Sequence, residues 1–221
     1  MTQSIRSEPP HILSAAFPSR LSTDVNRMLT AVPQARLRPT APFEVEVQVE
    51  VQGEVIAIPY RVYNDEPSAA LTRSLTGHQQ MLLHWLYTRH HDGRVRQRHL
   101  ESVIDAPPAP WAVPYVMQLA GEYVLEILET IRRGLDGLAV PGSTQRRLYG
   151  EFITRNPAFF ARTERRVVSY WSCYHRHLYP VFGTYPGSVL MDACRSAASE
   201  VHGERWPRNT PPPLPDTHRS S

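Results

Sequence analysis

Alternating apolar and polar positions near the N-terminus predict a β-hairpin over residues 43–63. One set of alternate positions is apolar, and the other is acidic or amide-bearing (Phe43, Val45, Val47, Val49 and Val51; Glu44, Glu46, Gln48, Glu50 and Gln52). A period of two places each set on its own face of a strand. Gly53 can adopt the positive φ of a tight turn, and residues 55–63 would return as the second strand. Because an isolated hairpin is marginal in water, we expect its valine face to pack against helices.

Apolar residues recur at helical spacing along most of the remaining chain. A short helix is predicted near residues 21–32, where Ser22, Thr23 and Asp24 suit an N-cap. The other predicted helices cover residues 76–91, 94–104, 111–136, 143–154, 157–179 and 187–202. The pattern predicts one α+β domain over residues 21–202, mainly a bundle of about five to six helices beside the hairpin.

Both ends of the chain have the composition of loosely ordered segments. Residues 1–20 are polar and contain prolines, and the sequence PPPLP occupies residues 211–215. We expect a flexible N-terminus over residues 1–20 and a disordered, proline-rich tail over residues 203–221.

The chain has 24 basic residues besides histidine, and all of them are arginine. Without lysine it cannot build a P-loop, a kinase site or a Schiff-base site of the usual kinds. The net charge of +3 is unevenly distributed, because residues 142–221 hold eleven arginines against six acidic residues. This distribution favours an acidic or anionic partner.

The sequence indicates a cytoplasmic protein that does not enter membranes. It contains no apolar run of 18 residues, and its first residues lack the apolar region of a secretory signal. Cys173 and Cys194 are the two cysteines, and we expect both to be free thiols in a reducing compartment.

The segment RHHDGRVRQRH at residues 89–99 contains the candidate ligand-binding residues. Helical geometry places Arg94 and Arg98 on the face opposite the apolar residues of the second helix, with His90 and His91 at the preceding turn (Leu100, Val103 and Ile104 form the apolar face). These four residues could bind an anion or an acidic partner.

The same segment also allows a helix-turn-helix that binds DNA, formed by helices near residues 76–91 and 94–104. In that arrangement Arg94, Gln97 and Arg98 would face the bases. Glu101 and Asp105 would lie on the outer face as well, where they would repel phosphates. We therefore favour a solvated helix pair over DNA binding.

Arg89 lies on the apolar stripe of the first of these helices, together with His78. We expect Arg89 to extend its guanidinium from the helix end into water. If Arg89 is buried, it requires a carboxylate or several carbonyl groups, and its partner would mark a structural or functional centre.

His91-Asp92 resembles the metal-binding dyad of HD-domain phosphohydrolases. The resemblance implies an all-helical, metal-dependent hydrolase whose remaining ligands would be His78 or His84 and Asp105 or Asp136. It covers two residues, and Gly93 interrupts the helix directly after the dyad. Seven helical residues also separate His84 from His91 by about 10 Å, too far for one ion. We therefore expect no bound metal and no cofactor.

Two further charged faces are expected to be solvated. Glu122, Glu126 and Glu129 lie on the polar side of the helix predicted at residues 111–136. In the helix at residues 157–179, arginines are predicted on one side and a buried aromatic set on the other (Arg162, Arg165 and Arg176; Phe159, Phe160, Tyr170, Trp171 and Tyr174). The sequence as a whole predicts a non-catalytic binding or adaptor protein that recognises an acidic partner or an anion through arginine-rich helical surfaces.

Overall fold

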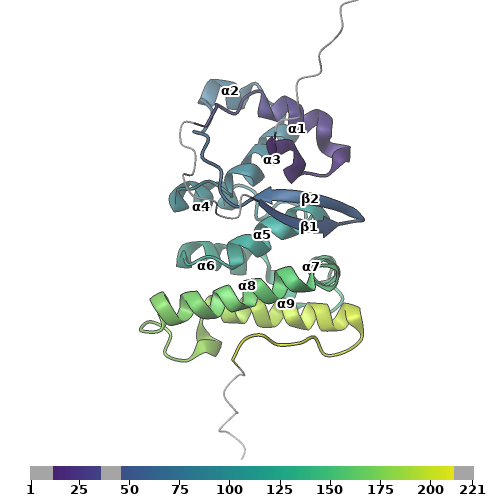
Figure 1. The fold of residues 1–221 in the computed structure, drawn as a ribbon, viewed down its shortest axis with the longest axis vertical. Helices are drawn as coiled ribbons and strands as arrows, with labels where there is room; N and C mark the ends of the chain where they lie inside the picture. The colour runs from purple at the N-terminus through teal and green to yellow at the C-terminus, as the bar shows by residue number, and fades with distance from the viewer. Residues whose placement is uncertain (1–11, 36–45, 212–221) are drawn as a thin grey trace, which may run out of the picture.

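The computed structural model describes residues 12–35 and 46–211 and shows a mainly helical α+β fold, as predicted (Figure 1). The described residues form nine α-helices and one two-stranded antiparallel sheet. The helices are α1 (Ser22–Leu29), α2 (Ala69–Arg73), α3 (Gly77–Tyr87), α4 (Gly93–Glu101), α5 (Val113–Ala120), α6 (Leu125–Gly134), α7 (Thr144–Arg155), α8 (Pro157–Tyr170) and α9 (Pro186–His202).

The predicted hairpin is present as β1 (Glu46–Val51) and β2 (Glu54–Pro59). Gln52 and Gly53 form its turn, with φ values of 53° and 85°. Positive φ at both central residues is typical of a type I′ hairpin turn. The apolar face is buried, as predicted (Val47, Val49, Val51, Ile56 and Ile58). The predicted strand residues 43–45 lie outside the described part of the chain.

The hairpin lies between two groups of helices (Figure 1). Helices α1 to α3 are at the top of the view, and α7, α8 and α9 are at the bottom. Asn156, between α7 and α8, binds the edge of β1, since its Oδ1 accepts from the Glu50 amide at 2.8 Å and its Nδ2 donates to the Glu50 carbonyl at 2.9 Å. Helices α7 and α9 can approach closely because Gly150 has no side chain. A Cβ at this position would lie 2.5 Å from the Ala197 carbonyl oxygen.

Several boundaries differ from the sequence prediction. Leu21 is the N-cap of α1, which continues a 3₁₀ turn. The Asp24 carboxylate instead accepts from Gln79 Nε2 at 2.8 Å. The helix predicted at residues 111–136 is two helices, α5 and α6, separated by a break after Gly121.

Both ends of the described chain are packed against the fold. Residues 12–21 form two 3₁₀ turns, and Ala16 and Phe17 are buried. Beyond α9, Trp206 packs against the core and Thr210 is buried. These residues belong to the folded part of the chain, although composition alone predicts flexible ends there.

Candidate anion-binding surface

Glu122 is the centre of a buried ionic cluster, contrary to the prediction that it faces water. The break between α5 and α6 turns its side chain inward, where it is 3% exposed. Glu122 Oε1 accepts from Arg61 Nη1 at 2.9 Å and from Arg89 Nη1 at 3.0 Å. Glu122 Oε2 lies 2.8 Å from Arg96 Nε. We call these four residues the Glu122 centre.

The prediction that Arg89 reaches water is wrong, because its side chain is completely buried. Arg89 Nη2 donates to the Tyr60 carbonyl at 2.9 Å, so the guanidinium has a carbonyl partner as well as the carboxylate. Arg96 Nη1 donates to the carbonyls of His90 and His91 at 2.8 and 2.9 Å. The two arginines thereby join the end of β2 to the turn between α3 and α4.

The Glu122 centre has more positive than negative charge. Three guanidinium groups face one carboxylate, a formal excess of two positive charges. Burial alone would raise the pKa of Glu122, but the three arginines hold it below its ordinary value. Burial lowers the pKa of Arg89 to about 10, and Arg61 and Arg96 act in the same direction. Both Glu122 and Arg89 are therefore charged at neutral pH, and the excess charge persists.

The Glu122 centre reaches the surface through Arg61, whose side chain is 16% exposed. Arg61 lies over the Tyr60 ring, and Arg166 from α8 approaches the same ring and donates to the Tyr60 hydroxyl. Burial opposes the charge on Arg166, yet hydrogen bonds to Tyr170 and Tyr60 raise its pKa above the ordinary value. A second group of cations and aromatic rings therefore lies beside the buried centre.

Three tyrosines extend this surface. The rings of Tyr123, Tyr170 and Tyr174 lie 5.8 to 6.1 Å apart, centroid to centroid. Tyr123 is 49% exposed and Tyr174 is 57% exposed. We call the combined surface the Tyr–Arg patch; it consists of Tyr60, Arg61, Tyr123, Arg166, Tyr170 and Tyr174.

The exposure of Tyr174 contradicts the prediction that this side of the helix is buried. A π-helical turn, Trp171–His175, follows α8 and changes the direction in which later side chains project. A regular helical period therefore does not apply beyond Tyr170. Within α8 itself the buried side includes Phe159, Phe160 and Val167.

The four ligand-binding residues expected from the sequence do not converge on one exposed site. His90 is 6% exposed, and its Nδ1 accepts from the Asp92 amide. His91 is exposed and stacks on Tyr63. Arg94 is exposed, whereas Arg98 Nη2 pairs with Glu66. Part of the expected cationic face of α4 is thus neutralised.

Glu66 also begins a short chain of imidazoles. Its Oε1 lies 2.7 Å from His99 Nε2, and His99 Nδ1 lies 2.8 Å from His84 Nδ1. Burial lowers the pKa of His84 and lowers that of His99 to about 4. Both imidazoles are therefore neutral at pH 7, which suits a chain in which His84 donates to His99 and His99 donates to Glu66.

The residues of the HD-like dyad have structural partners. Asp92 is the N-cap of α4, and its carboxylate accepts from the Arg94 amide at 2.8 Å. Among residues 12–35 and 46–211, no three histidine, cysteine or acidic side chains are grouped so that they could hold a metal ion. Cys173 is exposed, Cys194 is buried, and both are free.

A second buried glutamate, Glu164 on α8, has a different environment. Arg195 binds its Oε1, while the backbone amide and Nδ2 of Asn209 donate to Oε2 at 3.1 and 2.8 Å. Arg195 and Arg208 also pair with Asp192. Two guanidinium groups and two carboxylates balance in this group, which we call the Glu164 centre.

The molecule is thus a mainly helical α+β protein with two buried ionic centres, one of which adjoins an exposed cationic and aromatic surface. Comparison with protein-family models, with curated proteins and with solved structures gives no match. In the described part of the chain, none of the helices has the length and apolar character needed to cross a membrane.

Proposed function

We propose that this protein is a non-catalytic, cytoplasmic binding protein that recognises an anionic group on its partner through the Tyr–Arg patch. The observation that carries this proposal is the charge excess of the Glu122 centre, which lies directly behind Arg61. An anion near Arg61 and Arg166 would offset positive charge that Glu122 leaves uncompensated. Charge-assisted hydrogen bonds to guanidinium groups are among the stronger polar interactions in proteins.

The composition of the patch also supports binding to another macromolecule. Tyrosine and arginine are enriched in the energetically important parts of protein interfaces. Here Tyr123 and Tyr174 offer exposed ring area beside the cations. An acidic segment of a partner protein could contact the rings with its apolar groups and the arginines with its carboxylates.

The two alternatives suggested by the sequence have less support. DNA binding by α3 and α4 would use the outer face of α4, where Arg98 is paired with Glu66 and Gln97 binds Glu101 at 2.9 Å. A metal-dependent hydrolase would use His91 and Asp92. In the structure His91 stacks on Tyr63, and Asp92 caps α4. We therefore retain anion recognition as the proposed function.

The test compares two double variants that remove the same charge from different places. Arg61→Gln with Arg166→Gln alters the Tyr–Arg patch, whereas Arg94→Gln with Arg98→Gln alters the residues first expected from the sequence. Binding of fluorescent poly-L-glutamate is titrated at low and moderate salt. We expect the patch variant to bind about tenfold more weakly at low salt, and added salt to weaken wild-type binding.

Melting temperatures of both variants establish that any loss of binding does not come from unfolding. Equal loss in the two variants would show a diffuse charge effect and contradict a site at the patch. Loss confined to Arg94 and Arg98 would place the site at the α4 turn. Retention of a DNA duplex by wild type, with no affinity for poly-L-glutamate, would favour the DNA-binding alternative.

A further inference from the structure

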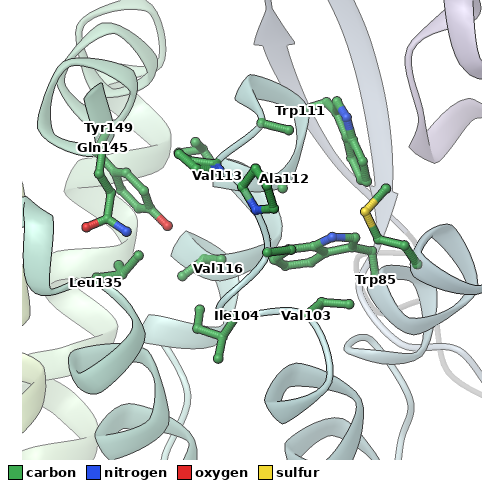
Figure 2. A pocket seen from close by; sticks show the side chains of 15 residues that line it. Trp85, Val103, Ile104, Trp111, Ala112, Val113, Val116, Leu135, Gln145 and Tyr149 are labelled. Carbon is green, nitrogen blue, oxygen red and sulfur yellow. The ribbon is translucent and has the colours of Figure 1, made fainter. Parts of the chain in front are cut away.

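The apolar cavity between α3, α5 and α7 does not suit an anion (Figure 2). Trp85 and Trp111 form one end of it, and Gln145 and Tyr149 form the other. It has room for water-sized molecules over about 40 Å³, and none of the described residues that line it is charged. Its buried polar atom without a partner, Gln145 Oε1, is an acceptor and would repel an anion. The chemistry of the anion is therefore set at the Tyr–Arg patch.

Arg61 has hydrogen-bond donors that the fold does not use. Its Nη1 donates to the Tyr60 carbonyl at 2.8 Å and to Glu122 Oε1 at 2.9 Å, which occupies both hydrogens of that nitrogen. Nε and Nη2 form no hydrogen bond within residues 12–35 and 46–211. These two nitrogens form one edge of the guanidinium, and such an edge matches two oxygen atoms of an anion.

Arg166 supplies a second guanidinium at the same tyrosine ring. The Cζ atoms of Arg61 and Arg166 lie 4.7 and 5.2 Å from the centroid of the Tyr60 ring. Arg166 forms its hydrogen bonds with the hydroxyls of Tyr60 and Tyr170, and it has no acidic partner in the described part of the chain. Hydroxyl groups do not neutralise its charge, so this charge adds to the excess of two at the Glu122 centre.

An anion with two charges fits this surface better than an anion with one. Three positive charges are uncompensated, two in the Glu122 centre and one on Arg166. A carboxylate carries one negative charge, whereas a phosphate monoester carries about −1.5 to −2 at pH 7 and has three acceptor oxygens. Residues 165–191, which supply Arg166 and two of the tyrosines, include no acidic residue that would repel a dianion.

The tyrosines indicate what carries the phosphate. The Tyr170 ring lies 5.8 Å from the ring of Tyr123 and 6.1 Å from that of Tyr174, and its hydroxyl binds Arg166. Tyr123 and Tyr174 are about half exposed, so a ring on the ligand can lie beside them while its phosphate reaches the arginines. Paired aromatic rings contribute to binding beyond the area that they bury.

We propose that the anion recognised by the Tyr–Arg patch is the dianion of a phosphate monoester on an aromatic ring, which in a partner protein is a phosphotyrosine. The phosphate oxygens accept from the free edge of Arg61 and from Arg166, and the ring lies against Tyr123 and Tyr174. The inference rests on the proposed function, because it specifies the ligand of the same surface.

Phenyl phosphate and phenyl sulfate test the second charge, because both have a phenyl ring and a tetrahedral anionic group. Isothermal titration calorimetry with wild type at pH 8 should show about tenfold tighter binding of phenyl phosphate. At pH 5 the phosphate is mainly a monoanion, since its second pKa is about 6, and the preference should fall to about twofold. Phenyl sulfate stays a monoanion, so its affinity reports titration of the protein itself, including His175, whose Nε2 lies 2.7 Å from the Tyr123 carbonyl.

Matched arginine variants locate the site. Arg61→Lys keeps the charge but loses the two-donor edge, and it should bind phenyl phosphate about tenfold more weakly. Arg165→Gln removes an exposed charge from the residue next to Arg166 and should change this affinity little, because Arg165 lines a different groove together with Arg155. Equal effects of the two variants would overturn the assignment to Arg61.

Peptides identify the carrier of the phosphate. The peptide Ala-Gly-phosphotyrosine-Gly-Ala should bind about threefold to tenfold more tightly than its phosphoserine counterpart. Tyr123→Ala should remove this difference while phenyl phosphate remains preferred over phenyl sulfate. Equal affinity of wild type for the two peptides would overturn the role of the rings, and tighter binding of AMP than of the phosphotyrosine peptide would overturn the assignment to a partner protein.

Failure of this inference is distinguishable from failure of the proposed function. Equal affinities for the two phenyl probes at pH 8, both weakened in Arg61→Gln with Arg166→Gln, would leave a general anion site and overturn the preference for a dianion. Affinities that this double variant does not change would overturn both proposals. If the double variant does not fold, the phosphate preference of wild type at pH 8 and its decline at pH 5 decide the inference.

Discussion

The Glu122 and Glu164 centres bury the same kind of carboxylate in different surroundings. Glu164 is fully buried and lies in a group in which carboxylates and guanidinium groups are equal in number. Glu122 is almost as deeply buried but faces three guanidinium groups. The Glu164 centre joins α8, α9 and residues 208–210, whereas the Glu122 centre opens through Arg61 onto the Tyr–Arg patch.

The difference separates a structural role from a capacity to bind. A balanced group is already compensated, so its main effect is to connect segments. A group with excess positive charge lowers the cost of bringing an anion to it. We therefore expect removal of one charge to change the free energy of unfolding by different amounts in the two centres.

The largest effect is expected from Glu122→Gln. The substitution leaves three guanidinium groups near one another with no carboxylate, and removing one partner of a buried pair typically costs about 3–5 kcal/mol. Glu126→Gln on α6 is the control, because Glu126 is exposed and should change stability little. Urea unfolding measures both variants. A cost below about 1 kcal/mol for Glu122→Gln would mean that the arginines do not depend on this carboxylate.

A pair of arginine variants compares the two centres directly. Arg195→Gln removes one of two cations from the balanced group and should cost about 3 kcal/mol. Arg61→Gln removes a partly exposed cation from the group with excess charge and should cost at most about 1 kcal/mol, because Arg89 and Arg96 still pair with Glu122. Denaturant unfolding of both variants tests this order. If Arg61→Gln cost more stability than Arg195→Gln, the excess positive charge of the Glu122 centre would not explain how the two centres differ.

Acid should destabilise the protein, because the imidazole chain that begins at Glu66 is neutral in the folded state. His99 has a pKa of about 4 in the folded protein against 6.5 in an unfolded chain, so between these values the unfolded state binds more protons. The contribution of His99 to stability is then complete above about pH 6.5 and is lost as the pH falls toward 4, by about 3 kcal/mol in all. His84, His90 and Glu66 also have lowered pKa values and add to the loss. Thermal unfolding against pH should show a weaker dependence in His99→Gln but not in His177→Gln, which alters an exposed residue.

A smaller loss of stability than that of Arg195→Gln is expected from Asn209→Ala, which alters the same Glu164 centre. It removes one hydrogen bond to Glu164 Oε2 but leaves the bond from the backbone amide of residue 209. A hydrogen bond to a charged group contributes about 1.5–3 kcal/mol, so we expect a loss near the lower end of that range. Asn26→Ala, at an exposed position on α1, is the matched control. Equal stabilities in urea would show that residues 208–210 do not contribute to the Glu164 centre.

Local pattern was sufficient to predict the hairpin and most helices. Strict alternation around Val47 and Val49, followed by Gly53, permits one register, and helices α7 and α9 lie close to their predicted bounds. These elements depend on neighbouring residues and on a single apolar face.

The candidate site depends on departures from regular helix, which periodicity cannot detect. A continuous helix over residues 111–136 would align Glu122 with Glu126, but the break after Gly121 separates them. Gly121 was the available signal for that break. Tyr174 projects outward because of the π-helical turn, which has no sequence signature. The sequence places Arg89 on the apolar stripe, yet its partner Glu122 is 33 residues away and cannot be inferred from local pattern.

The contact between Asn156 and β1 has a consequence for how the protein behaves in concentrated solution. Its amide accepts from and donates to the backbone of Glu50, as a neighbouring strand would. A two-stranded sheet has two open edges, and an unpaired edge is a template for another chain. Asn156 occupies part of one edge with a side chain that cannot propagate the ladder. The residue therefore acts against intermolecular strand pairing, and its loss would favour self-association even where the fold itself survives.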